Sequence, residues 1–241
     1  MNLGVEELDL QARVADVLGI RVAAENDVKA AALGAYALHG AVGSVGYLNL
    51  GTGIAAGIVR DGVLWRGAHG TAGEVGHVSV DPSGPQCGCG QRGCIEQYGS
   101  GRALLRMANE IADAGGIGQH LATARDANGG VLDGADLATL IAGEDPGALA
   151  ALRELGSWLG QACASISAVL DPELFVFGGG VAIAGDLLLD PIREAYLAHL
   201  PARGFHPEPR FETAELVNDA GVVGAADLAR IHAGSMLSSA N

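Results

Sequence analysis

The chain has 241 residues, 49% of them hydrophobic, so it can bury one or two domain cores and is not a disordered segment. Its 14 basic and 28 acidic residues give a formal net charge of −14, which disfavours direct binding to nucleic acid. No apolar run reaches the roughly 18 residues of a membrane span, and residues 1–14 lack the apolar core of a signal peptide. We therefore expect a cytoplasmic protein without membrane contact. Its acidic surface suits an enzyme whose phosphorylated ligand arrives with a divalent cation.

The N-terminal part of the chain carries helical patterns. Apolar spacing predicts a short amphipathic helix over 9–18 and a brief strand over 21–24. An alanine-rich helix is predicted over 28–38, with Asn26 or Asp27 as its N-cap.

Strands and helices are interspersed through the remainder of the chain. The predicted strands cover 45–50, 54–59, 63–65, 174–177 and 210–213, and the predicted helices cover 103–111, 149–170, 186–200 and 221–231. Asp61-Gly62 is typical of a two-residue hairpin turn, and residues 115–134 are interpreted as a variable loop with short helical pieces. The mixture of elements, joined by glycine-rich loops, predicts an α/β fold.

The sharpest motif is a cluster of cysteines. Cys87, Cys89 and Cys94 follow His77 along one glycine-rich loop. Three thiolates and one imidazole complete the tetrahedron that Zn²⁺ prefers and leave no open position, which predicts a structural zinc site. The alternatives are reduced surface thiols or a disulfide, and the close spacing of Cys87 and Cys89 disfavours a bridge between them. Cys163 falls on an apolar helix face and is predicted to lie in the core.

Carboxylates and a histidine flank the same loop. Glu74, His77 and Glu96 could hydrogen-bond the hydroxyls of a polyol. The plainer interpretation is that Glu96 caps a helix and Glu74 is a solvated charge. Asp27 is likewise either an N-cap or a general base that takes a proton from a hydroxyl attacking phosphorus.

Two glycine-rich turns could approach a phosphate or a nucleotide. Gly51-Thr52-Gly53 lies between two predicted strands and offers backbone N–H groups and a hydroxyl, although an ordinary hairpin turn would have the same composition. Gly178-Gly179-Gly180 follows a buried strand and permits close approach of a nucleotide. It lacks the spacing of a dinucleotide-binding motif.

Taken together, these motifs resemble the ROK family of bacterial sugar kinases and sugar-responsive repressors. The resemblance is carried by Glu25-Asn26-Asp27, Gly51-Thr52-Gly53, Glu74-Val75-Gly76-His77 and Cys87-Gly88-Cys89-Gly90-Gln91-Arg92-Gly93-Cys94-Ile95-Glu96. It implies an actin-like ATPase fold of two ribonuclease-H-like domains, a glucokinase-like activity with Mg²⁺ and ATP, and a homodimer.

The resemblance also implies a role for each motif. Asp27 would be the catalytic base for the 6-hydroxyl of a hexose, and the sugar would be bound by Asn26, Glu74, His77 and Glu96. A structural zinc ion would be held by His77, Cys87, Cys89 and Cys94. ATP would meet Gly51, Thr52 and Gly53 through its phosphates, and its adenosine would lie near Gly178, Gly179 and Gly180.

The N-terminus departs from the family pattern. Family kinases begin with a strand and an Asp-x-Gly-Gly-Thr type phosphate loop, which these residues do not contain, and Met1-Asn2-Leu3-Gly4 resembles a point inside the small domain. We therefore expect 1–40 to be a remnant of that domain and 41–241 to be the large domain, with a zinc loop over 77–94. The C-terminal helix is expected to pack back on the small domain.

Three functions agree with these features. They are an ATP-dependent hexose kinase, the sugar-binding effector domain of a ROK transcriptional repressor, and an inactive truncated kinase.

Overall fold

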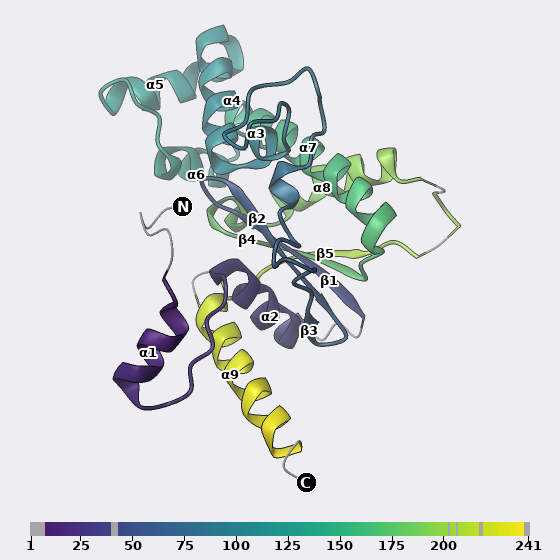
Figure 1. Ribbon diagram of the computed structural model, residues 1–241. Helices are drawn as coiled ribbons and strands as arrows, with labels where there is room; N and C mark the ends of the chain where they lie inside the picture. Colours follow the sequence, from purple (N-terminus) through teal and green to yellow (C-terminus); the bar gives the residue numbers. More distant parts are fainter. Residues whose placement is uncertain (1–7, 40–42, 202, 206, 217–218, 239–241) are drawn as a thin grey trace.

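The computed structural model describes residues 8–39, 43–201, 203–205, 207–216 and 219–238 (Figure 1). Its central sheet contains β1 (Ser44–Leu50), β2 (Ile54–Arg60), β3 (Val63–Leu64), β4 (Leu174–Gly178) and β5 (Arg210–Thr213). The strand order is β3-β2-β1-β4-β5. The first three strands form an antiparallel meander, whereas β4 runs parallel to β1 with Tyr47 opposite Val176, and β5 runs parallel to β4. At the predicted hairpin, Asp61 and Gly62 have φ of 51° and 75°, as a tight turn between twisted strands requires.

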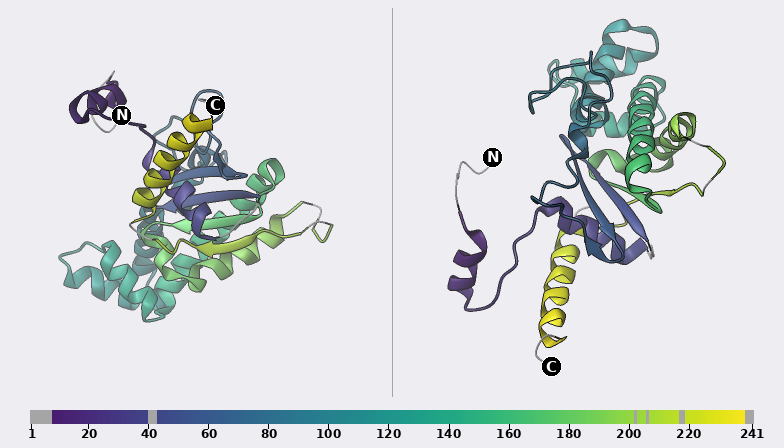
Figure 2. Two further views of the ribbon diagram at one scale, coloured as in Figure 1. Left: turned by 90° about the horizontal axis from the view of Figure 1, so that it is seen from below. Right: turned by 45° about the vertical axis from the view of Figure 1, so that its right-hand side comes forward.

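Helices cover both faces of this sheet (Figure 2). One face carries α2 (Asp27–His39) and α9 (Ala220–Ser238), and the other carries α7 (Pro146–Leu170) and α8 (Asp186–His199). Alternate strand residues serve the two cores: Tyr47 and Val176 pack toward α2, whereas Leu48 and Phe175 belong to the core that includes α7 and α8. This alternation is the period of two that a sheet buried on both faces requires.

The remaining elements lie beside α7 or apart from the sheet. The ones near α7 are α3 (Glu96–Gly99), α4 (Gly101–Ala114), α5 (Gln119–Ala127), α6 (Gly134–Ala142) and the 3₁₀ turn η2 (Gly116–Gly118). Two further 3₁₀ turns lie elsewhere: η1 (Val75–His77) contacts β2, and η3 (Gly180–Ala184) contacts β1, β4, α6 and α8. By contrast, α1 (Leu10–Leu18) buries none of its residues and stands away from the sheet in both figures.

Two sequence predictions need correction. The strand predicted over 21–24 is not present, because this segment has no regular structure and no neighbouring strand to receive its hydrogen bonds. The helix α6 is absent from the sequence prediction, although Asp133 caps it by accepting from the backbone N–H groups of Ala135 and Asp136. The long helix predicted over 149–170 is confirmed and begins earlier, at Pro146.

The packing of α2 and α9 bears on the expected domain division. The two helices are in close contact, because Gly34 and Gly224 let their backbones meet: a Cβ on Gly224 would lie 1.7 Å from the Ala30 carbonyl oxygen. α2 also packs on β1 and β2 and shares their core. The division into 1–40 and 41–241 stays a prediction, and Met1-Asn2-Leu3-Gly4 lies outside the described residues.

Candidate functional site

The start of α2 separates the two interpretations of Asn26 and Asp27. The Asn26 side-chain oxygen accepts from the backbone N–H groups of Val28 and Lys29, both at 3.1 Å, so Asn26 is the N-cap. Asp27 is the first helical residue, is exposed, and accepts from the Val28 N–H at 2.9 Å through one oxygen. Its second oxygen is available to another partner, so the capping role does not account for Asp27.

The loop after β3 returns to β2 just before Glu74 and His77. Two glycines allow this contact: a Cβ on Gly73 would lie 2.4 Å from the Ala56 carbonyl oxygen, and one on Gly76 would lie 2.4 Å from that of Ile54. Glu74 is exposed and His77 is half-buried in η1. Gly57 of β2 in turn faces α2, with a Cβ position 3.3 Å from the Lys29 Cα, so β2 contacts both the helix start and this loop.

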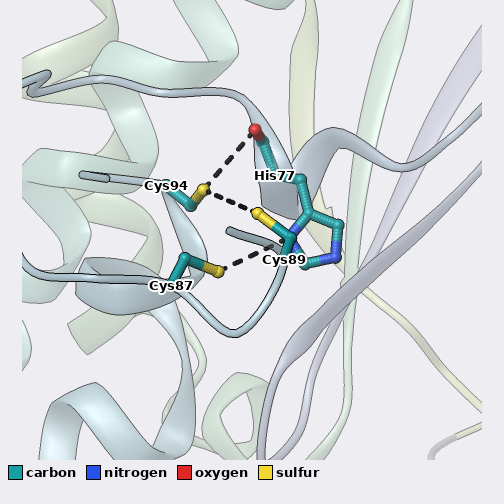
Figure 3. Close-up of side chains that lie close together, drawn as sticks. All are labelled: His77, Cys87, Cys89 and Cys94. Atoms are coloured by element: carbon teal, nitrogen blue, oxygen red, sulfur yellow. Dashed lines mark hydrogen bonds between the residues drawn. The ribbon is translucent and has the colours of Figure 1, made fainter. Parts of the chain in front are cut away.

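The predicted zinc ligands converge. The ligand atoms of His77, Cys87, Cys89 and Cys94 all lie within 4.8 Å of one another (Figure 3). Cys87 Sγ lies 3.7 Å from His77 Nδ1, and Cys89 Sγ lies 3.5 Å from Cys94 Sγ. A zinc tetrahedron with bonds of about 2.1–2.3 Å has edges of about 3.6–3.8 Å, so these separations fit the ion.

The chemistry of the donors points the same way. Burial, together with hydrogen bonds to the thiols of Cys89 and Cys87, raises the pKa of the Cys94 thiol to about 12. A hydrogen bond from the backbone of Gln91 lowers the pKa of Cys89 instead. Three adjacent sulfurs ionise together only beside a cation, and a metal that binds thiolates provides one. The structure also does not support the alternative of a disulfide bond, because Cys87, Cys89 and Cys94 are all free in it.

Glu96 connects the zinc loop to the Gly51-Thr52-Gly53 turn. It follows Cys94 by two residues, is half-buried, and its Oε2 accepts from the backbone N–H of Ile54 at 3.2 Å. The turn closes on itself through the Gly51 N–H, which donates to the Gly53 carbonyl oxygen at 3.1 Å. Glu96 is the first residue of α3 and follows the N-cap Ile95, so the capping interpretation of Glu96 is wrong, and its carboxylate is bound to the backbone of β2 instead.

A cavity of about 740 Å³ opens on the other side of that turn. Gly51, Thr52 and Gly180 line it, as do residues of α4, α6 and η3. Gly53 is not among the lining residues, and Gly178 and Gly179 line a smaller cavity of about 240 Å³ at the ends of β4 and β5. These two glycines also have a packing reason: a Cβ on Gly178 would lie 2.1 Å from Tyr47 Oη, and one on Gly179 would lie 2.6 Å from the Leu50 carbonyl oxygen.

Sequence reasoning missed part of the cavity wall. Leu137 and Ile141 of α6 form an apolar side, and Arg102 at the start of α4 brings a positive charge. The signal for α6 was present as apolar residues three and four apart after an Asp N-cap. No short pattern in the sequence links Arg102 to Thr52. In the structure, α4 is joined to the turn by the Gly101 N–H, which donates to the Gly51 carbonyl oxygen at 2.8 Å.

A mixed sheet with helices on both faces, and a glycine-rich turn beside a cavity, define this as an α/β protein of the actin-like ATPase class. The family model described as the ROK family matches residues 1–232. The chain belongs to the ROK family, as the motifs predicted.

Named relatives include kinases and repressors. The chain is 39% identical to a glucokinase of Streptomyces coelicolor over 232 residues, which is 95% of this chain and 73% of the relative. It is 30% identical to a putative xylose repressor of Caldicellulosiruptor over 92% of this chain and 55% of the relative. Among solved structures, a ROK family glucokinase from Streptomyces griseus in complex with glucose and AMPPNP matches with a TM-score of 0.82 and 39% identity. That match covers 92% of this chain and 72% of the other. Of the helices that the structure describes, none has the length and apolar character needed to cross a membrane.

Proposed function

We propose that this chain is an ATP-dependent kinase of a glucose-like hexose, with Asp27 as the general base for the 6-hydroxyl. The single observation that carries the proposal is the turn at 51–53. Ile54, directly after it, binds Glu96 on the acceptor side, while Gly51 and Thr52 line the cavity of about 740 Å³ on the donor side. A phosphate held at this turn would lie between a sugar and a nucleoside.

The residues divide between two ligands. On the acceptor side we assign Asn26, Glu74, His77 and Glu96 to the hexose. With His77 Nδ1 directed at Cys87, its Nε2 is the atom left for a sugar hydroxyl. On the donor side we assign Gly51, Thr52 and Gly53 to the phosphates and 178–180 to the region of the adenosine.

The chemistry follows from the position of Asp27. Its carboxylate accepts the proton of the 6-hydroxyl while that oxygen attacks the γ-phosphorus of ATP, and the bond from phosphorus to the ADP oxygen breaks. Mg²⁺ bound with ATP would neutralise the charge of the phosphates, because a protein of net charge −14 would otherwise repel them. We assign a structural zinc ion to His77, Cys87, Cys89 and Cys94, where it would fix the loop that leads to Glu96.

A second candidate function is that of a sugar-binding effector domain of a transcriptional repressor. The similarity to a putative xylose repressor over 92% of this chain favours it. A sensor would keep the sugar ligands and would not need Asp27 as a base. An inactive kinase would bind sugar or nucleotide without turnover.

One experiment separates these functions. ADP release would be measured with Mg²⁺, ATP and a panel of hexoses, for the wild-type chain and for Asp27→Asn. Turnover of one sugar that falls about 10²–10⁴-fold in Asp27→Asn is the expected result. Sugar binding without turnover in either protein would refute the kinase and leave the sensor or the inactive kinase.

Two further assignments accompany the proposal. We expect a homodimer, which light scattering at several protein concentrations would detect, and a cytoplasmic location, in keeping with the free thiols of the zinc loop.

A further inference from the structure

Two side chains at the start of α2 hold the loop of residues 66–73, called the 66–73 loop below. The first is Glu25. Its Oε2 lies 2.7 Å from Arg66 Nε, and its Oε1 accepts from the backbone N–H of Asn26 at 3.0 Å. The Glu25 side chain is only 14% exposed, so this ion pair is partly shielded from solvent.

The second is Lys29, which is 7% exposed and whose Nζ donates to the Gly70 carbonyl oxygen. A cation in the first turn of a helix opposes the helix dipole, and burying it adds a desolvation cost. Helix stability therefore does not explain a lysine here. The contact with the 66–73 loop does, because the carbonyl of Gly70 provides the acceptor.

The position of the 66–73 loop determines the position of Glu74, the residue that follows it. The loop closes on itself through the Ala72 N–H, which donates to the Arg66 carbonyl oxygen at 3.1 Å, and Gly70 turns with φ of 75°. Gly73 then sits against β2, and Glu74 is the next residue. Arg66 and Gly70 are thus fixed to the same five-residue segment, 25–29, that carries Asp27.

We propose that Glu25 and Lys29 are positioning residues, which set the distance between Glu74 and Asp27 by fixing the 66–73 loop, and so determine the affinity for the acceptor sugar. This inference rests on the proposed function. It predicts a change in the affinity for the sugar and none in the affinity for ATP, because none of the residues that make the two contacts lines the cavity at Thr52.

The test is a charge exchange across the ion pair. Glu25→Arg and Arg66→Glu are each expected to raise the KM and the Kd for glucose on the order of tenfold with the KM for ATP unchanged. The double variant is expected to restore both glucose values to within about twofold of wild type. Arg153 and Glu194 form a matched control, since their pair is 69% and 70% exposed and exchanging it should change nothing.

A second variant tests the buried contact. Lys29→Met keeps the aliphatic stem and removes the ammonium, and it is expected to raise the glucose KM while amide hydrogen exchange accelerates within 66–73 and not in α9. Lower thermal stability with unchanged glucose affinity and unchanged exchange in the loop would overturn the inference.

Failure of the inference differs from failure of the proposed function. If the wild-type chain binds and phosphorylates glucose but the single charge variants do so equally well, the positioning role is wrong and the kinase stands. If the wild-type chain neither binds nor phosphorylates any hexose, the proposed function is wrong and sugar positioning falls with it.

Discussion

Glu96 Oε2 accepts the backbone N–H of Ile54 at 3.2 Å, which joins the first turn of α3 to the first residue of β2. The proposed sugar ligand and the proposed phosphate turn therefore share one stretch of backbone. Gly53 makes this possible, because a Cβ at that position would lie 2.3 Å from the same carboxylate oxygen. A substitution at Gly53 should consequently change the affinity for the sugar, even though Gly53 belongs to the proposed phosphate turn.

We expect Gly53→Ala to displace Glu96 and to raise the glucose KM about tenfold, the equivalent of one charged hydrogen bond of roughly 1.5 kcal/mol. Gly51→Ala is the control, since the nearest atom to its Cβ would be 3.7 Å away, an ordinary contact. Steady-state kinetics on both variants measure the difference. Equal behaviour of the two would show that Glu96 does not contact sugar from this position.

The zinc assignment predicts one zinc ion per chain in metal analysis of the purified protein. Cys89→Ser should lose the metal and the folded loop, because two thiolates and one imidazole leave the tetrahedron incomplete. Cys163→Ala should keep the metal, since Cys163 is buried in the core that includes α7. A folded wild-type protein without metal would contradict the assignment.

Asn26 should contribute to stability as a cap. We expect Asn26→Ala to lower the free energy of unfolding by about 1 kcal/mol, because the N–H groups of Val28 and Lys29 lose their acceptor. Asn26→Asp keeps an acceptor and should cost little. Urea unfolding of the three proteins provides the comparison, and an unchanged midpoint in Asn26→Ala would mean that the cap is dispensable.

Arg102 is expected to contact the nucleotide phosphates. It is the one charged side chain among the described residues that line the large cavity. Arg102→Met should raise the KM for ATP about tenfold and leave that for glucose unchanged, in line with the loss of a charge-assisted hydrogen bond. Arg106→Met, one turn along α4 and paired with Glu110, serves as the control. A larger effect on glucose than on ATP would argue against this role.

The cap of α6 should give a small pH dependence at acid pH. Hydrogen bonds from the backbone N–H groups of Asp136 and Ala135 hold the pKa of Asp133 below its ordinary value. Its contribution to stability is therefore complete above the unfolded pKa of about 4 and is lost as the pH falls through the lower folded pKa. Asp133→Asn keeps the cap and removes the titration. The free energy of unfolding, measured with urea, should fall less steeply between pH 5 and pH 3 in this variant than in wild type.

Local signals in the sequence predicted the fold well where one short pattern decides the structure. Asp61-Gly62 specifies its hairpin, and the apolar period before Asp171 specifies α7, which Asp171 ends with φ of 43°. The segment 21–24 has the residue types of a strand, but a strand also needs a neighbouring strand to pair with. This prediction failed because a short sequence pattern does not show whether such a neighbour is present.

The candidate site shows the same limit. The convergence of His77, Cys87, Cys89 and Cys94 was predictable, because all four fall within one short stretch of the chain. The bond between Glu96 and Ile54, the place of Arg102 in the cavity, and the contact of Lys29 with Gly70 join residues 41 to about 50 positions apart. Only the packing of glycines against backbone brings those residues together.

The glycine contact between α2 and α9 has a mechanical consequence. Where two backbones meet without intervening side chains, nothing can repack to let one helix slide past the other. The start of α9 also lies beside Asp27, since a Cβ on Gly221 would be 3.9 Å from its carbonyl oxygen. The carboxylate at the tip of α2 therefore moves with α9 as one rigid part, and any closing movement around the ligands must carry these two helices together.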